Sequence, residues 1–204
     1  MNSKMNHHHV VWHRSQVRPS DRNVMNGHRS ANIWFTGYSG SGKSTLAHTL
    51  EKRLFEMKCR TFVFDGDNVR HGLCKDLGFS SEDRRENIRR ITEMVKLFLD
   101  AGLIALTAFI APFQKDRDLI RSRLGADNYI EVFCDCPLQI CEKRDVKGIY
   151  KKARQGLIKD FTGISSPYEP PSAPDIVLQT GTQGIDDCIA QLINLLHNRR
   201  VFDL

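Results

Sequence analysis

The sequence lacks a hydrophobic run long enough to cross a membrane. A membrane helix needs about 18 to 20 apolar residues with few charges. The best candidate, residues 103–113 (LIALTAFIAPF), is shorter and has a proline near its end. Residues 1–16 also lack the apolar core of a secretory signal. We therefore expect a cytoplasmic protein with no membrane partner.

Cysteine pairs at two-residue spacing, which are typical of zinc sites, are also missing. The stretch CDCPLQIC brings three of the six cysteines close together, but Cys134 lies in an apolar, strand-like run. We therefore predict that the cysteines are buried structural thiols rather than metal ligands.

Strong charge of one sign is absent as well. The 204 residues carry a net charge of +6, with 40% apolar and 26% charged residues, which suits one domain with a sizeable core. A mild basic excess fits small anionic ligands, nucleic acid or acidic membranes. Because no nucleic-acid recognition module occurs and the aromatic residues mostly fall in strand-like runs, we expect no nucleic-acid partner.

Strands and helices alternate along most of the chain. Residues 1–30 are polar and aperiodic, and we expect them to form a loosely docked arm before a domain at 31–204. Apolar runs without period-two alternation predict strands that are covered on both faces, and hence a parallel sheet. The expected fold is a three-layer α/β domain with a central, mainly parallel five-stranded sheet. The strands are expected within 32–37, 60–67, 103–112, 129–135 and 174–180.

Helices are predicted between these strands, at 42–58, 80–102, 116–125, 137–145 and 184–200. Leu46, Leu50 and Leu54 recur at helical spacing in the first of them. The segment 147–174 breaks the rhythm, since it is rich in Lys, Arg, Gly and Pro and has little apolar content. Long loops in small domains are usually functional or disordered, and we interpret this one as a lid.

The stretch TGYSGSGKST matches G-x-x-x-x-G-K-[ST] at every fixed place, between a predicted strand and a predicted helix. Such a loop turns backbone N–H groups and a helix N-terminus toward phosphates. We expect Lys43 to reach the β- and γ-phosphates of a nucleoside triphosphate, and Ser44 to bind Mg²⁺. The predicted nucleotide-binding residues of the loop are Gly37, Tyr38, Ser39, Gly40, Ser41, Gly42, Lys43, Ser44 and Thr45.

Carboxylates and arginines follow the second predicted strand. Carboxyl ends of parallel strands face the ligand crevice, so Asp65 and Asp67 should lie beside the phosphates. Asp65 directly ends the apolar run and is the better candidate for a base or a metal-organising residue. Arg70 follows, and Arg84 and Asn87 share one helical face. Arginine forks suit a phosphate or a sulfate.

Motifs of one related class are missing. A guanine-reading N-K-x-D is absent, since the nearest match, 142–145, begins with glutamate, and the second strand carries no D-x-x-G switch. The residues therefore favour a small-molecule kinase whose lid excludes water. Two alternatives stay open at this point: a nucleotide kinase with another acceptor, and a regulatory ATP-binding protein without transfer.

Several blocks resemble the adenylylsulfate kinase family. They include DGDNVRHGL, LGFSSEDRRENIRR, VFCDCPLQICEKRD, KGIYKKARQG and FTGISSPYEPP. The resemblance implies the P-loop NTPase fold and transfer of the γ-phosphate of ATP to the 3′-hydroxyl of adenosine 5′-phosphosulfate, with Mg²⁺. It also implies a homodimer, and leaves room for docking to a separate ATP sulfurylase.

The resemblance also implies residue roles. Asp65 and Lys43 would be catalytic, and Arg144 would stack on the adenine of ATP. The residues expected to bind the acceptor are Asp65, Arg70, Phe79, Arg84, Asn87, Ile110, Lys147 and Phe161. Many family members carry serine where this chain has Ala111. Because Ala111 has no hydroxyl to carry a phosphate, we expect direct in-line transfer without a phosphorylated intermediate.

Overall fold

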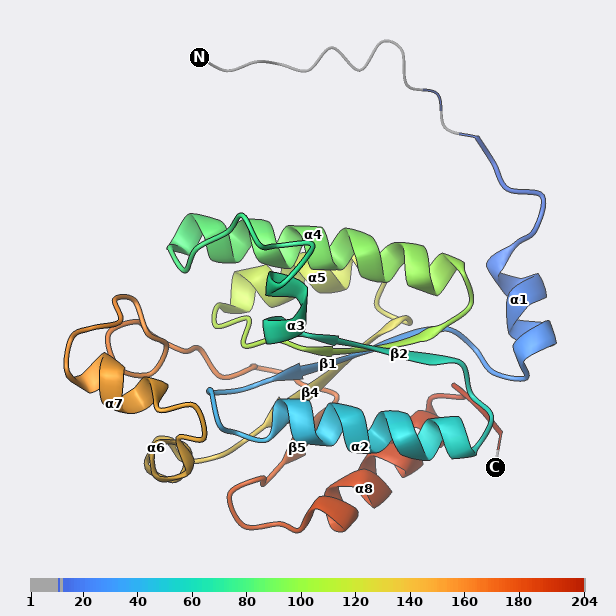
Figure 1. The fold of residues 1–204 in the computed structure, drawn as a ribbon. Coiled ribbons are helices and arrows are strands. Elements are labelled where there is room, and N and C mark those ends of the chain that lie inside the picture. The colour runs from blue at the N-terminus through green and yellow to red at the C-terminus, as the bar shows by residue number, and fades with distance from the viewer. Residues whose placement is uncertain (1–10, 12, 204) are drawn as a thin grey trace.

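The computed structural model describes residues 11 and 13–203, and the sheet at its centre has five parallel strands. Their order is β2-β3-β1-β4-β5, and because every pair is parallel, the carboxyl ends of all the strands lie at the same edge of the sheet (Figure 1). The strands are β1 (Ala31–Thr36), β2 (Thr61–Asp65), β3 (Ile104–Ala108), β4 (Tyr129–Cys134) and β5 (Ile176–Leu178). The predicted fold class is confirmed, including the position of every strand.

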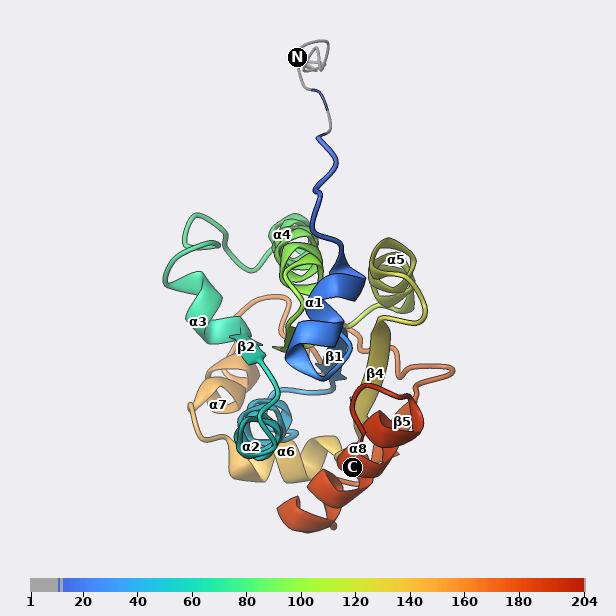
Figure 2. The ribbon, with the colours of Figure 1, turned by 90° about the vertical axis from the view of Figure 1, so that its right-hand side faces the viewer.

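Helices cover both faces of the sheet. Viewed end-on in Figure 2, α4 and α5 lie on one side of the sheet and α2 and α8 on the other. The four layer helices are α2 (Lys43–Glu56), α4 (Ser81–Asp100), α5 (Gln114–Leu124) and α8 (Ile185–Asn198). The helix α4 begins where the sequence predicted, because the Ser80 hydroxyl accepts a hydrogen bond from the Asp83 amide.

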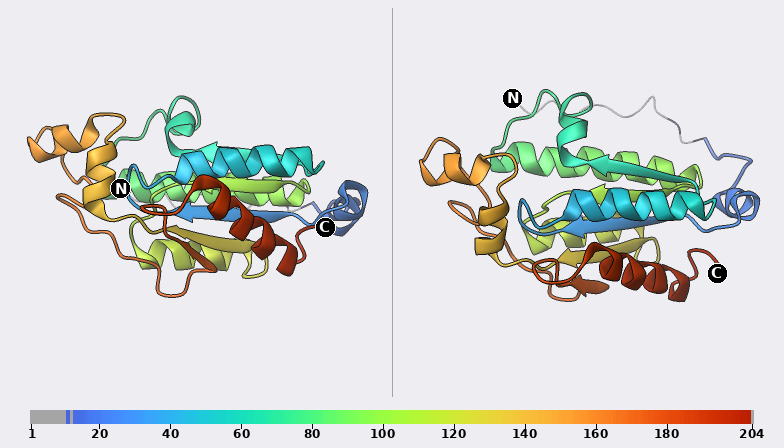
Figure 3. Two further views of the ribbon diagram at one scale, coloured as in Figure 1. Left: turned by 90° about the horizontal axis from the view of Figure 1, so that it is seen from below. Right: turned by 60° about the horizontal axis from the view of Figure 1, so that its bottom comes forward.

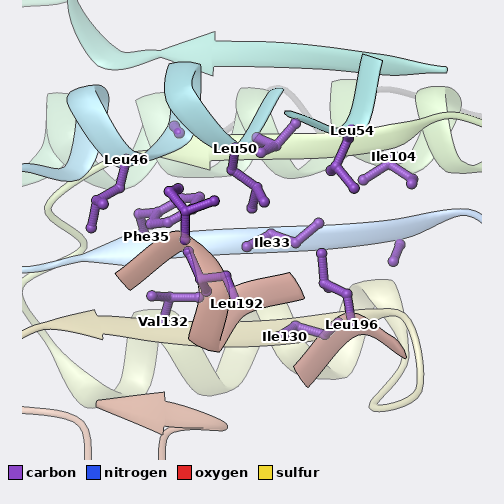
Figure 4. Packing of buried hydrophobic residues seen from close by; sticks show 14 of the residues in the cluster. Ile33, Phe35, Leu46, Leu50, Leu54, Ile104, Ile130, Val132, Leu192 and Leu196 are labelled. Carbon is purple, nitrogen blue, oxygen red and sulfur yellow. The ribbon is translucent and has the colours of Figure 1, made fainter. Parts of the chain in front are cut away.

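The apolar stripes of the layer helices meet the buried strands. Leu46, Leu50 and Leu54 of α2 lie in one buried cluster with residues of β1, β3 and β4 and with Leu192 and Leu196 of α8, as Figure 4 shows. All six residues of β1 are buried, which explains the absence of a polar alternation in its sequence. This packing fixes the edge of the sheet from which the phosphate loop emerges.

The described part of the N-terminal arm contains a helix, α1 (Pro19–Asn26), which the aperiodic sequence did not predict. Pro19 fits the first turn of a helix, and the Asp21 side chain accepts from the Arg18 amide. The Asn26 amide donates to the carbonyl of Gly102 at 2.8 Å, which ties α1 to the body. Residues 19–26 thus form a helix bonded to the body, residues 1–10 and 12 lie outside the described residues, and the loosely docked arm stays a prediction.

The short helices α3 (Gly66–Arg70), α6 (Leu138–Arg144) and α7 (Ile149–Arg154) gather at the carboxyl edge of the sheet. Figure 3 shows α6 and α7 at the end of the sheet opposite α1. The predicted lid therefore has more structure than its composition suggested. Tyr150, Ala153 and Phe161 are buried with Cys136 and Cys141 in a small apolar cluster of their own.

All six cysteines are free and buried, as predicted. Within residues 11 and 13–203, no group of three or more His, Cys, Asp and Glu side chains is arranged to hold a metal ion. In the same part of the chain, no helix combines the length and the apolar character needed to span a membrane.

Candidate functional site

A cleft of about 610 Å³ opens at the carboxyl edge of the sheet. Its walls come from the loop after β1, from α3 and the start of α4, from the loop after β3, from the lid and from the segment after β5. Parallel strands deliver all of these segments to one edge, which is where such sheets bind ligands. The cleft is therefore formed by several segments that follow different strands, and not by one motif alone.

The phosphate loop curls tightly over the end of β4. Gly37 and Gly40 have φ angles of 144° and 75°, which side chains rarely adopt. A Cβ atom at Gly37 would lie 2.6 Å from the carbonyl oxygen of Cys134, and one at Gly40 would lie 3.1 Å from that of Cys141. Only glycine lets the loop backbone lie this close to these two carbonyl oxygens. The tight curl of the loop brings its backbone N–H groups to the start of α2.

Lys43 is buried at the first turn of α2. Its ammonium donates to the carbonyl oxygens of Gly37 at 3.0 Å and of Tyr38 at 2.6 Å. Burial lowers the pKa of Lys43 to about 8, mainly because the charged form loses its water. A phosphate oxygen beside this ammonium would restore the lost solvation.

The structure brings most of the predicted nucleotide-binding residues to the cleft wall. Those that line it are Ser39, Gly40, Gly42, Lys43, Ser44, Thr45 and Arg144. Gly37, Tyr38 and Ser41 instead form the inner frame of the loop. Tyr38 packs on Tyr168, with ring centroids 4.9 Å apart, and the buried Ser41 hydroxyl has no hydrogen-bond partner among the described residues.

Asp65 ends β2 and caps α3. Its carboxylate accepts from the Asp67 amide at 2.9 Å, and the residue is 8% exposed on the cleft wall. Asp67, two residues on, forms an ion pair with Lys147 of the lid. Asp65 and Asp67 thus line the same cleft as the phosphate loop, and their place beside bound phosphates stays a prediction.

Two arginines and an aromatic ring line the cleft where α3 and α4 reach it. The Arg70 guanidinium lies 4.3 Å from the ring centroid of Phe79 and donates to the carbonyl oxygens of Leu77 and Gly78. Phe79 is 60% exposed and lines the cleft, as do Arg84 and Ile110. A planar cation beside an open aromatic face suits an anionic nucleotide.

Arg84 links the start of α4 to the lid. Its guanidinium donates to the carbonyl of Asp160 at 2.8 Å and to the Thr162 hydroxyl at 3.1 Å. Burial lowers the pKa of this guanidinium, because the charge is partly removed from water. The charge therefore lies where an anion would be attracted.

Asn87 lies one turn further along α4 and also lines the cleft. Its side chain is buried, and its Nδ2 atom has no hydrogen-bond partner within the part of the chain that the structure describes. Buried amides are normally satisfied. The Asn87 amide thus has a donor that the described residues leave unused beside the cleft.

Phe161 is the one predicted acceptor residue that the structure does not bring to the cleft wall. It is buried inside the lid, where it meets Tyr150 edge-to-face at 5.0 Å. Arg84 bonds the residues on either side of it, so the segment is held close to the start of α4 even though the ring packs in the lid cluster.

One part of the cleft wall, the segment after β5, was not predicted from the sequence. Thr180, Gln183 and Ile185 line the cleft there. Arg144 joins this segment to the phosphate loop, since it donates to the carbonyl oxygens of Thr180 at 2.8 Å and of Gly40 at 3.1 Å. The predicted parallel sheet could have indicated this part of the wall, because every segment that follows a parallel strand reaches the same edge of the sheet.

Comparisons with known proteins agree on one family. A family model described as Adenylylsulphate kinase matches residues 29–179. An adenylyl-sulfate kinase of Acaryochloris marina is 58% identical, with 94% of each chain covered. One of Oceanobacillus iheyensis is 54% identical over 94% of this chain and 96% of its own.

Solved structures extend the comparison to the fold. The APS kinase of Mycobacterium tuberculosis, solved in complex with AMPPNP and APS, is 47% identical and has a TM-score of 0.80. The alignment covers 83% of this chain and 99% of that one. A gluconokinase of Sinorhizobium meliloti is similar in fold alone, at 13% identity and a TM-score of 0.56 over 85% of this chain and 95% of its own.

Proposed function

The chain belongs to the adenylylsulphate kinase family, and from this we propose that it transfers the γ-phosphate of ATP to the 3′-hydroxyl of adenosine 5′-phosphosulfate. The observation that carries the proposal is one cleft with two different walls. One wall holds the phosphate loop and Lys43, and the other holds Arg70, Phe79 and Arg84. We call them the donor wall (37–45 with Arg144) and the acceptor wall (Arg70, Phe79, Arg84 and Asn87).

On the donor wall, we propose that the loop amides and the N-terminus of α2 bind the ATP phosphates. Lys43 leaves its two carbonyl partners for the β- and γ-phosphate oxygens. Arg144, held against the loop and Thr180, flanks the adenine of ATP.

Magnesium would fit between the donor wall and Asp65. Ser44 offers a hydroxyl and Asp65 a carboxylate, and both line the cleft. Mg²⁺ is typically held by one or two protein oxygens together with water and substrate phosphates, and such a site does not require a cluster of protein ligands. The ion would neutralise charge on the transferring phosphate.

On the acceptor wall, we propose that Arg70, Arg84 and Asn87 bind the phosphosulfate end and its ribose. Phe79 and Phe161 would enclose the acceptor adenine, which requires Phe161 to turn out of the lid cluster. The backbone at Ile110 faces the acceptor, and Lys147 acts from the lid.

The two walls bring two anions together, so their charges must be screened before reaction. We propose that Asp65, which ends β2 and lines the cleft, lies between the two substrates, where it orients the attacking hydroxyl and accepts its proton. Because Ala111 has no hydroxyl, we propose that the phosphate passes directly from ATP to the acceptor.

A panel of acceptors tests this function. Purified protein is incubated with ATP, Mg²⁺ and either adenosine 5′-phosphosulfate, AMP, GMP or CMP, and ADP and the phosphorylated product are measured. We expect phosphorylation of adenosine 5′-phosphosulfate at its 3′-position and much slower reaction with the others. A better rate with AMP, GMP or CMP would identify a different nucleotide kinase.

We further propose that 31–204 is the catalytic unit, that it acts in the cytoplasm as a homodimer, and that a separate ATP sulfurylase is a docking partner. An APS kinase of Thiobacillus denitrificans is described as hexameric, at 28% identity and a TM-score of 0.67, with 88% of this chain and 31% of that chain covered. Light scattering after gel filtration measures the mass of the assembly with and without the sulfurylase. A monomer mass in both runs would contradict the association.

A further inference from the structure

Arg117 of α5 is almost completely buried, although it was not among the predicted site residues. It is 1% exposed. Its Nη1 donates to the carbonyl of Ala111 at 2.7 Å, and its Nη2 donates to the carbonyl of Glu169 at 2.7 Å. Nη2 also donates to the Gln114 side chain at 2.9 Å, while Nε forms an ion pair with Glu131 at 3.0 Å. One side chain thus joins four separate positions.

The first of these positions is strained. Ala111 has a φ angle of 41°, in the left-handed region that alanine seldom occupies. Ile110, Ala111 and Pro112 all line the cleft. Strained backbone persists where the surroundings hold it, and it concentrates at functional sites. The bond from Arg117 to the Ala111 carbonyl is such a restraint, and it fixes the direction in which this loop faces the cleft.

The second position is the C-terminal end of the lid. The Glu169 amide donates to the carbonyl of Pro112 at 2.8 Å, and its carboxylate accepts from the Gln114 amide at 2.7 Å. Next to it, the Tyr168 hydroxyl lies 3.0 Å from the hydroxyl of Thr36 at the end of β1. The end of the lid and the strained loop are therefore bonded to each other and to the same guanidinium.

A buried ion pair is weak evidence for stability, because apolar residues of similar size often stabilise a core as well. A planar fork that reaches two carbonyls on separate segments has no apolar equivalent. We propose that Arg117 is a positioning residue for the transfer, which sets the Ile110–Pro112 backbone against the acceptor and fixes the end of the lid. The inference rests on the proposed function.

The experiment compares Arg117→Lys with Arg121→Lys. Arg121 lies one turn away and pairs with Glu131 and Asp175, but none of its hydrogen bonds or ion pairs within the described chain reaches the loop or the lid. The lysine at 117 keeps the charge beside Glu131 but cannot bond both carbonyls. We expect Arg117→Lys to raise KM for adenosine 5′-phosphosulfate about tenfold, through misplacement of the loop, with KM for ATP unchanged. Arg121→Lys should leave both values unchanged.

Trypsin cleavage in the lid gives a readout that needs no substrate. Lys151, Lys152 and Arg154 are exposed on α7. We expect them to be cut faster in Arg117→Lys than in the wild type or in Arg121→Lys. If the wild type did not phosphorylate adenosine 5′-phosphosulfate, the proposed function would fail, yet the cleavage rates would still test the anchoring of the lid.

Unchanged KM values and cleavage rates in folded Arg117→Lys would overturn the positioning role, as would an equal rise of both KM values. If that variant does not fold, Gln114→Ala replaces it, because position 114 is only half-buried. Removing this acceptor of the guanidinium should raise the same KM by a smaller factor. An unchanged KM in Gln114→Ala would then overturn the proposal.

Discussion

The two walls of the cleft are held by different kinds of interaction. The donor wall is held mainly by the backbone. Glycine conformations, backbone carbonyl oxygens and the N-terminus of α2 position the groups that would bind the phosphates. The acceptor wall is made of long side chains, and Arg84 spans from α4 to lid residues more than 70 positions away in sequence. Mutation should therefore affect the two walls separately, because different substrates depend on them.

The largest expected effect lies between the walls, at Asp65. Replacement by alanine or asparagine should lower turnover by about 10²- to 10⁴-fold, because the hydroxyl loses its proton acceptor. ATP affinity should change little. Asparagine is the matched control, since it can still cap α3 as Asp65 does. Steady-state rates and calorimetry measure both quantities, and an equal loss of turnover and ATP affinity would make Asp65 a binding residue only.

The next effect isolates the acceptor wall. Arg84→Ala removes a charged donor and the bonds to Asp160 and Thr162, so KM for adenosine 5′-phosphosulfate should rise about 10- to 100-fold. KM for ATP should stay close to the wild-type value. Arg85→Ala is the control, because Arg85 is exposed on the same helix and does not line the cleft. A parallel rise in both KM values for Arg84→Ala would show that the walls are not separate.

A smaller effect is expected on the donor wall, where ATP affinity should depend on pH through Lys43. Phosphate favours the charged form of Lys43, whose pKa in the folded chain is lowered to about 8 by burial. ATP affinity should therefore be constant below that pH and fall by up to about tenfold per pH unit above it. Calorimetry in buffers with different ionisation enthalpies should detect proton uptake on binding.

The same group has the opposite effect on the stability of the free protein. The ordinary pKa of lysine, 10.5, lies above the folded value, so the unfolded chain binds more protons between the two. The contribution of Lys43 to the free energy of unfolding should therefore rise with pH across this window. Lys43→Met should abolish both pH effects, and persistence of either one in that variant would exclude Lys43 as its source.

The smallest effect is expected at Ala111, where the walls meet. Ala111→Ser introduces a hydroxyl at this position, but direct transfer does not use it. Turnover should change no more than severalfold, and intact-mass measurements during the reaction should find no phosphate on either protein. A phosphoprotein that passes its phosphate to the acceptor would contradict direct transfer.

The two walls also differ in how well they can be predicted from the sequence. The phosphate loop is predictable because its requirement for glycine lies within the motif itself, where Gly37, Gly40 and Gly42 all have positive φ angles. The strands are predictable because their burial on both faces removes polar alternation.

The acceptor wall depends on contacts between distant segments, which local patterns do not encode. Arg84 and Arg85 are adjacent arginines on one predicted helix. Charge alone does not show which of them faces the cleft, and only the family resemblance distinguished them. The inward position of Phe161 and the wall after β5 escaped prediction for the same reason, as did the buried Arg117. The helix α1 was missed because its residues carry no apolar periodicity and none of them is fully buried.

The six buried cysteines allow local opening of the protein to be measured by thiol labelling. Thiolates rather than thiols react with alkylating agents, and burial raises the pKa of Cys134 and Cys141, beneath the phosphate loop, to about 12. Cys74 lies behind the acceptor wall and is buried as well. Each thiol should therefore be labelled only when its own region opens, so the labelling rates of Cys74 and Cys141 record separately how often the two sides of the cleft come apart.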